Sequence, residues 1–294
     1  MAENYYLTIA DLVVCVSNSI GTQLDKLLGI DEFKINSSDH VDIDIVLNSE
    51  INTANIAAAN VISSFSIEDE KYTLFYSEEQ YYFKLYDAKS DSTYSLSHHY
   101  NSKKVHISSC NSLQHLRFML WTAYSLASLQ YGAIFIHSSC IEHKNKAVLF
   151  LGESGTGKST QSRLWTEHIS VSQLINDDSP ILRIIDDKLT VYGSLWSGKT
   201  PCYRKVNHAV KAIIRIKRAS TNTIEKLDTL KAIAAIYPSF PPMFAYDETL
   251  ADKMLEQVSQ VVLRVPIYTL KCRPDAEAAL VTYQEIYGKQ DNNR

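Results

Sequence analysis

No run of apolar residues in this sequence approaches the roughly 20 residues that a transmembrane helix needs. The longest candidate, 113–129, contains Gln114, His115, Arg117, Thr122 and Ser125, and it therefore predicts an amphipathic helix instead. The first residues also lack the basic start and apolar core of a secretory signal. We therefore expect a cytoplasmic protein with no membrane partner.

Cysteine is scarce and widely scattered. The chain has five cysteines and no close pair among them: Cys15, Cys110, Cys140, Cys202 and Cys272. An odd, dispersed set in a chain of 294 residues is not a disulfide framework. We expect reduced and mostly buried thiols.

An excess of positive charge is missing as well. The chain carries 29 Lys and Arg against 33 Asp and Glu, a formal net charge of -4. Proteins that bind nucleic-acid duplexes usually carry a positive excess, because they neutralise phosphates. The composition therefore argues against a nucleic-acid partner. Hydrophobic residues at 45% and charged residues at 21% are ordinary for a globular protein that buries a core.

The pattern of apolar residues changes near Cys110. Before it, β-type runs at 5–16, 72–76, 81–86 and 105–108 are separated by polar turns, which indicates hairpins. After it, apolar residues at 113, 116, 120, 124 and 127 fall on one face of a helix. We therefore predict a β-rich domain over 1–110 and a second domain over 111–294. The first domain has no chemical motif, so we expect it to recognise an acceptor or another protein.

The second domain alternates strands and helices, which predicts an α/β fold. Its expected strands are 134–141, 147–151, a short strand that ends at 175, 182–185, 189–192, 209–216 and 266–272. Its expected helices are 158–167, 223–237, 247–262 and one that starts with Pro274 in its first turn and ends at Gly288.

One segment carries a specific chemical motif, G-x-x-x-x-G-K-[ST]. Its residues are, in order, Gly152, Glu153, Ser154, Gly155, Thr156, Gly157, Lys158, Ser159 and Thr160. Glycines let the backbone curl so that N–H groups point at phosphate oxygens, and the helix that follows presents its positive end to them. A lysine in this position bridges the terminal phosphates, and the hydroxyl after it is a magnesium ligand. The motif therefore predicts binding of ATP with Mg²⁺.

Two adjacent carboxylates follow the loop after one helix, one turn and one strand. Asp177 lies 19 residues beyond Lys158, so the strand can return Asp177 and Asp178 to the phosphates. One carboxylate can support the metal, and the other can accept a proton from an attacking hydroxyl. The competing interpretation is a solvated turn after a strand.

His137, the phosphate-binding loop and the pair Asp177–Asp178 together resemble the catalytic domain of HPr kinase/phosphorylase, which is similar in architecture to ATP-dependent phosphoenolpyruvate carboxykinase. The resemblance implies an α/β P-loop kinase domain of this type, which the smaller β-rich domain over 1–110 precedes. It also implies that Asp177 is the catalytic base, that Ser159 and Asp178 hold Mg²⁺, and that Lys158 and His137 complete the catalytic set.

Two departures from that family bear on the reaction. Its members have a glutamate near the strand that corresponds to 189–192, where this chain has no acid, and their later signature loop for the phosphorylase reaction has no clear counterpart. We therefore expect a kinase with a different substrate, namely the serine hydroxyl of a protein or peptide, or a small molecule. The family's oligomers also make a homo-oligomer one option.

Several questions stay open from the sequence alone. A second cation at the site has four candidates: Lys199, Arg204, Arg215 and Arg273. His137 is equally compatible with an ordinary strand histidine. Two other functions compete with a kinase: an ATP-binding sensor that signals through a partner, and an ATPase without a phosphorylated acceptor.

Overall fold

The computed structural model describes residues 3–19, 23–198 and 200–288, which form two compact units. The first unit comprises the described residues up to Tyr131 together with Met243–Ala251, and the second comprises Gly132–Pro242 and the described residues from Asp252 onward. The division falls between Tyr131 and Gly132, and not at the expected Cys110, because helix α2 (Leu113–Ser128) packs on strands of the first unit. No helix in the described ranges is long and apolar enough to cross a membrane.

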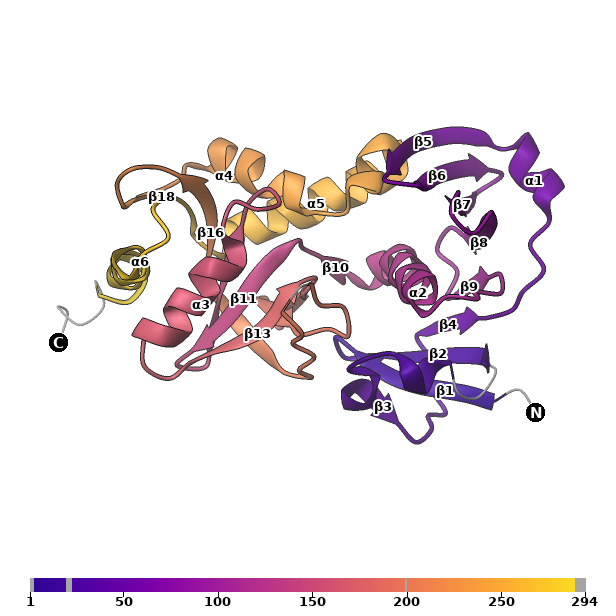
Figure 1. Ribbon diagram of the computed structural model, residues 1–294, viewed down its shortest axis with the longest axis horizontal. Coiled ribbons are helices and arrows are strands. Elements are labelled where there is room, and N and C mark those ends of the chain that lie inside the picture. The colour runs from indigo at the N-terminus through magenta and orange to yellow at the C-terminus, as the bar shows by residue number, and fades with distance from the viewer. Residues whose placement is uncertain (1–2, 20–22, 199, 289–294) are drawn as a thin grey trace. The chain divides into compact units, whose positions relative to one another are not determined.

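The first unit is built on one sheet of nine strands (Figure 1). Their order is β3-β1-β2-β4-β9-β8-β7-β6-β5, with parallel pairing of β2 with β4 and of β4 with β9 and antiparallel pairing elsewhere. The strands are β1 (Glu3–Ile9), β2 (Leu12–Ser19), β3 (Lys34–Ile35), β4 (Ile43–Val46), β5 (Asn60–Ile67), β6 (Glu70–Ser77), β7 (Gln80–Asp87), β8 (Ser92–His99) and β9 (Lys104–Ile107). Short helices connect them: η1 (Leu24–Lys26), η2 (Ile30–Phe33) and α1 (Thr53–Ala58), with η3 (Leu129–Tyr131) after α2.

The β-type run predicted over 5–16 forms the hairpin β1–β2. Ala10 and Asp11 form its two-residue turn with φ angles of 50° and 60°, a conformation that suits tight hairpins. Helix α2 agrees closely with the expected helix and lies against β8, β9 and β4. Ser112 caps it through its hydroxyl, which accepts from the His115 N–H at 3.5 Å.

The second unit is also built on one sheet, of order β10-β14-β15-β16-β12-β11-β13, in which β18 additionally pairs with β16 and carries β17. The strands are β10 (Ile134–Phe135), β11 (Ser138–His143), β12 (Lys146–Leu151), β13 (Ser172–Asp178), β14 (Ile181–Ile185), β15 (Lys188–Tyr192), β16 (Asn207–Arg218), β17 (Thr223–Lys226) and β18 (Ile267–Cys272). The helices are α3 (Lys158–His168), α4 (Thr229–Ile236), η4 (Tyr237–Ser239), α5 (Glu248–Arg264) and α6 (Ala276–Tyr287). In η5 (Pro242–Tyr246) the chain passes from the second unit to the first, and within α5 it returns.

Three expected elements of the second unit differ from the observed ones. The expected strand 134–141 is broken at Ile136 and His137, because β10 pairs with β14 whereas β11 pairs with β12 and β13. The expected helix 223–237 is strand β17 followed by α4, since 223–226 pairs with β18 and the Asp228 side chain caps α4. Helix α6 begins after its cap, Asp275, and not at Pro274.

The parallel strands β12, β16 and β18 lie at the centre of this sheet, and helices α3 and α6 lie side by side against it (Figure 1). Trp165 of α3 is fully buried between Phe150 of β12 and Tyr283 of α6, with ring centroids 6.0 and 6.1 Å away. This packing anchors α3 at the carboxyl end of β12. In sheets of this kind, ligands bind at the carboxyl ends of the parallel strands.

Candidate functional site

The predicted phosphate-binding loop joins β12 to α3, the strand-to-helix context that the motif requires. Gly157 is the N-cap of α3 and has a φ of 114°, which side chains of L-residues rarely adopt. No side chain caps this helix end, and the first N–H groups of any helix lack partners within it. The helix therefore presents backbone donors and its positive end to the loop, which suits an anion.

Lys158 folds back onto the loop that it follows. Its ammonium donates to the carbonyls of Gly152 at 2.9 Å and Glu153 at 3.3 Å. Burial lowers the pKa of Lys158, and the charge of Arg215 acts in the same direction, while Asp178 and Asp177 act against both. The ammonium thus lies against the loop and feels the charges of both carboxylates.

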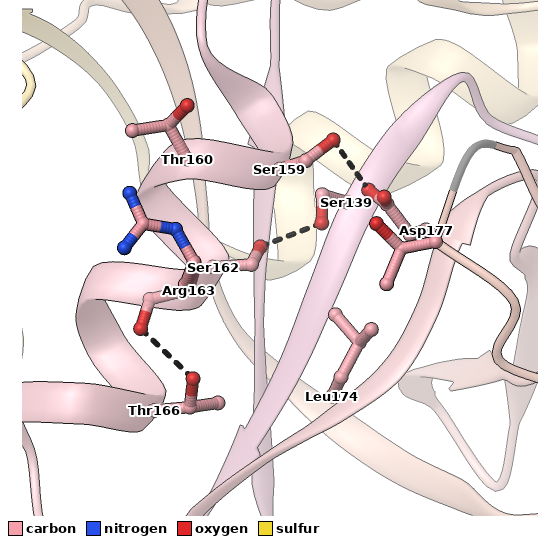
Figure 2. Close-up of a pocket in the computed structure, with 9 residues that line it drawn as sticks. Ser139, Ser159, Thr160, Ser162, Arg163, Thr166, Leu174 and Asp177 are labelled. Carbon is pink, nitrogen blue, oxygen red and sulfur yellow. Dashed lines mark hydrogen bonds between the residues drawn. The ribbon is translucent and has the colours of Figure 1, made fainter.

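The hydroxyl of Ser159 and the carboxylate of Asp177 form a direct pair, drawn in Figure 2. Ser159 Oγ donates to Asp177 Oδ1 at 3.0 Å, and Asp177 is only 5% exposed. The first residue of the predicted pair, Asp177, therefore lies beside the hydroxyl predicted to bind magnesium. Asp178, which the family resemblance assigned to the metal with Ser159, makes no such bond in the described structure.

Asp178 instead pairs with His137. His137 Nδ1 lies 3.3 Å from Asp178 Oδ1, and the Ser179 hydroxyl donates to the other oxygen at 3.0 Å. Burial favours the neutral acid, but His137, Ser179 and Lys158 outweigh it, so the pKa of Asp178 is lowered. Asp178 is thus an ionised carboxylate at neutral pH with a histidine that orients it.

The backbone at Asp178 is in an unusual conformation, with a φ of 141°. Non-glycine residues in such sparsely populated regions cost about 1–3 kcal/mol each and cluster at functional sites. His137 occupies the break between β10 and β11, where its N–H donates to the Ser239 carbonyl at 2.6 Å. The break that sequence periodicity missed is therefore what brings His137 to Asp178.

A short loop after β15 packs against the end of β13. The Gly198 N–H donates to the Asp177 carbonyl at 2.6 Å, and an added Cβ on Gly198 would lie 3.1 Å from that oxygen and 3.2 Å from the Asp178 Cβ. The Asn176 side chain holds the same loop by donating to the Trp196 carbonyl at 3.0 Å. The close approach explains why a glycine stands at position 198, a role that the sequence did not reveal.

The candidate cations that the structure describes are placed very differently. Arg215 on β16 lies with its guanidinium 4.0 Å from the Glu153 carboxylate and donates to the Ala235 carbonyl. Arg204 is engaged elsewhere, with Glu142 and the Leu174 carbonyl, and Lys199 lies outside the described residues. Of Arg204 and Arg215, it is therefore Arg215 that lies at the loop.

Two pockets flank the start of α3. One, of about 300 Å³, is lined by hydroxyl side chains, Arg163, Leu174 and Asp177, and Figure 2 shows it. The other, of about 410 Å³, lies along the loop at Gly155, Thr156 and Gly157 and is closed by the ends of β16 and β18. Thr160 borders both pockets.

The second pocket brings in one residue that the sequence argument missed. Arg218, at the end of β16, donates to the Gly155 carbonyl, and both residues line the pocket together with Arg273. Arg273 is held there by Asp275 and Glu277. The position of Arg218 at the end of a strand was the signal that could have indicated it. Strand β16 is parallel to β12, and the carboxyl ends of both strands meet at the loop.

No cluster of three or more His, Cys, Asp or Glu side chains with metal-binding geometry occurs within the ranges that the structure describes. Magnesium in phosphate-transfer sites is typically held by one or two protein oxygens together with phosphates and water. The adjacent oxygens of Ser159 and Asp177 fit that kind of site.

No protein-family model matches the chain, and no curated protein matches it. Among solved structures, the chain is similar to the Hpr(Ser) kinase/phosphatase from Coxiella burnetii at 13% sequence identity. The match covers 53% of this chain and 95% of that chain, with a TM-score of 0.32. This distant structural likeness says nothing about activity. Any argument about activity must therefore rest on the chain's own residues.

Proposed function

We propose that this chain is a kinase that binds ATP with Mg²⁺ on the loop of 152–160 and transfers the γ-phosphoryl group to a hydroxyl, with a serine of a protein or peptide as the acceptor. One observation carries the proposal. The phosphate-loop hydroxyl of Ser159 bonds one of two neighbouring carboxylates, Asp177, while the other, Asp178, is held ionised by a histidine.

The geometry supports an assignment of roles to the two aspartates that is the reverse of the one implied by the family resemblance. Asp177 shares its oxygen with Ser159 and is buried, which suits a metal-supporting carboxylate. Asp178 has an exposed side-chain fraction of 40% and a lowered pKa, so it can meet an acceptor hydroxyl as a carboxylate. We therefore assign Asp178 as the base and His137 as the residue that orients it.

The other residues of the site would bind the phosphates and neutralise their charge. When bound, a magnesium nucleotide supplies an electrophilic phosphoryl group. Lys158 and the N–H groups at the start of α3 would hold its phosphate oxygens, and Arg215 would add positive charge at the same loop. Asp178 would accept the proton from the acceptor hydroxyl. Because the pocket with Arg218 and Arg273 continues from the phosphate loop, we assign the nucleoside to it.

Thermal unfolding tests the nucleotide site without knowledge of the acceptor. A ligand at about 100 times its Kd stabilises a protein by about 2.7 kcal/mol. We expect ATP with Mg²⁺ to raise the Tm of the wild type and to lose this effect in Lys158→Ala. Arg163→Ala is the matched control, because it removes a cation of the same helix whose guanidinium pairs with Glu167 at 2.8 Å. No shift in the wild type with ATP would refute nucleotide binding.

Transfer separates a kinase from a sensor or an ATPase. Radiolabelled ATP is incubated with an array of serine-containing peptides, and the phosphorylated peptides and free phosphate are both counted. Asp178→Asn should retain the ATP-dependent Tm shift and lose peptide phosphorylation by about 10²–10⁴-fold, the usual contribution of a general base. Phosphate release without any labelled peptide would instead indicate an ATPase.

A further inference from the structure

In the part of the chain that the structure describes, the edge strands of both sheets are protected, with one exception. An edge strand exposes unpaired N–H and C=O groups, and proteins usually blunt it by shortness, charge or cover. Strands β3 and β10 have two residues each, and β17 carries Glu225 and Lys226. The outward carbonyls of β13 accept from Gly198, Arg204 and Cys202. Strand β5 has none of these protections within the described residues.

Strand β5 runs over eight residues, Asn60–Ile67, without a charged residue, a proline or a glycine. Three of its apolar side chains are largely in solvent: Val61 at 60%, Phe65 at 39% and Ile67 at 57% exposed. Among the described strands, β5 pairs with β6 alone and lies at the end of the sheet. This is the composition of a strand that accepts another strand.

The apolar surface of β5 is continuous with the core of the first unit. The Phe65 ring stacks on Tyr72 at a centroid distance of 5.0 Å, and Tyr72 contacts Phe118 of α2 at 5.2 Å. The face that α2 covers in the middle of the sheet therefore extends to the edge without cover. A strand added at β5 could pack its apolar side chains beside Phe65 and Ile67.

The register of the hairpin β5–β6 shows which backbone groups face outward. Ile67 and Glu70 flank the two-residue turn, and in such hairpins this flanking pair exchanges backbone hydrogen bonds. Because hydrogen-bonded pairs alternate along a strand, Ser66 and Ser64 direct their N–H and C=O groups to the free edge. Lys71 lies opposite Ser66 on β6.

Carboxylates mark both ends of this edge. Glu68 and Asp69 form the turn after β5, and Glu78 and Glu79 form the turn after β6, next to the start of β5. Only Asp69 has a lysine partner among the described residues, Lys89 at 3.0 Å. A second copy would have to pair antiparallel by two-fold symmetry, which would place the acidic end of one strand beside the acidic start of the other. Self-pairing is therefore disfavoured, and a segment with basic ends is favoured.

We propose that β5 is a docking edge for another protein, to which an extended segment adds as a further strand. The segment has alternating apolar residues in its middle and lysine or arginine at both ends. The backbone of Ser64 and Ser66 provides the hydrogen bonds, Phe65 and Ile67 provide the apolar contact, and the turn carboxylates select the basic ends. The proposal concerns the first unit alone and does not depend on nucleotide binding.

The test uses a fluorescein-labelled peptide in which a central Val-Thr-Val-Thr-Val segment is flanked by two lysines at each end. Fluorescence anisotropy measures its Kd for the full chain. Ser66→Pro removes one outward N–H, so we expect at least a tenfold higher Kd. Ser66→Ala is the matched control, because it keeps that N–H and should bind as the wild type does. Circular dichroism checks that both variants retain the fold.

Two further peptides keep the test decisive if the proline variant unfolds. N-methylation of alternate amides in the peptide removes its own donors and should abolish binding to the wild type. Glutamates in place of the terminal lysines should weaken binding at least tenfold. The proposal is overturned if the lysine peptide does not bind, if N-methylation has no effect, or if the glutamate peptide binds equally well. It is also overturned if light scattering finds a dimer that Ser66→Pro dissociates, because β5 would then join two copies.

Discussion

The hydrogen bond between Ser159 and Asp177 gives the sharpest prediction about the site. The variants are Ser159→Ala, Asp177→Asn and the double variant, each without nucleotide. Ser159→Ala removes the hydroxyl that donates to Asp177 Oδ1 at 3.0 Å and leaves a carboxylate that is 5% exposed without this donor. Leaving a buried polar group unsatisfied costs about 1–3 kcal/mol. We therefore expect the free energy of unfolding to fall by about that amount.

The assay is thermal unfolding followed by circular dichroism or calorimetry. For a domain of about 150–250 residues, 1 kcal/mol corresponds to a shift in Tm of about 2–4 °C. The two single variants should not add, because each removes the same contact, and contacting residues show coupling energies of about 0.5–3 kcal/mol. Ser162→Ala is the matched control, since its hydroxyl lies on the same helix and bonds the neutral Ser139 hydroxyl at 2.6 Å.

The same variants report on the metal. If Asp177 supports Mg²⁺ beside Ser159, then Mg²⁺ should add to the ATP-dependent rise in Tm of the wild type, and this addition should vanish in Ser159→Ala and Asp177→Asn. Asp178→Asn should keep it. The reasoning is refuted if the changes at Ser159 and Asp177 are additive, or if Asp178→Asn alone removes the Mg²⁺ effect. The second result would restore the assignment that the family resemblance implied.

Two more changes test other parts of the site. His137→Ala removes a group that helps to lower the pKa of Asp178, so this pKa should rise. With peptide phosphorylation as the assay, the acidic limb of the pH–rate profile should therefore move to higher pH. An unchanged acidic limb would exclude Asp178 as the base. Gly157→Ala forces a Cβ into a φ of 114° and should cost about 1–2 kcal/mol, measured by urea denaturation. Arg163→Ala, at an exposed position, is the control. An equal loss of unfolding free energy in that variant would contradict the argument about Gly157.

The sequence was sufficient where the signal is local. The phosphate loop, the strand before it and the helix after it follow from residues within about 25 positions of one another, and the structure has β12 and α3 there. Helix α2 followed in the same way from its apolar spacing. The pair Asp177–Asp178 was also a short-range prediction, because one helix and one strand separate it from the loop.

Sequence reasoning failed where partners distant in the chain decided the outcome. The segment 223–226 has a helical pattern but forms β17, because it pairs with residues of β18 that lie 42 to 48 positions later in the chain. The sequence marked 5–16 as a β-type run but did not locate the turn at Ala10, because the pairing of the two halves of the hairpin fixes it. The domain boundary shifted for a similar reason, because α2 buries its apolar face on the first sheet.

The sequence by itself determined which residues could do chemistry, whereas only the tertiary structure decided which of them meet. Ser159 contacts Asp177 and His137 contacts Asp178, and both pairings depend on where β13 lies against β11 and on the φ of Asp178. Adjacent residues in a strand point to opposite faces, so which carboxylate turns to the loop is a matter of register and backbone angle. Neither quantity is encoded in the local pattern of residues.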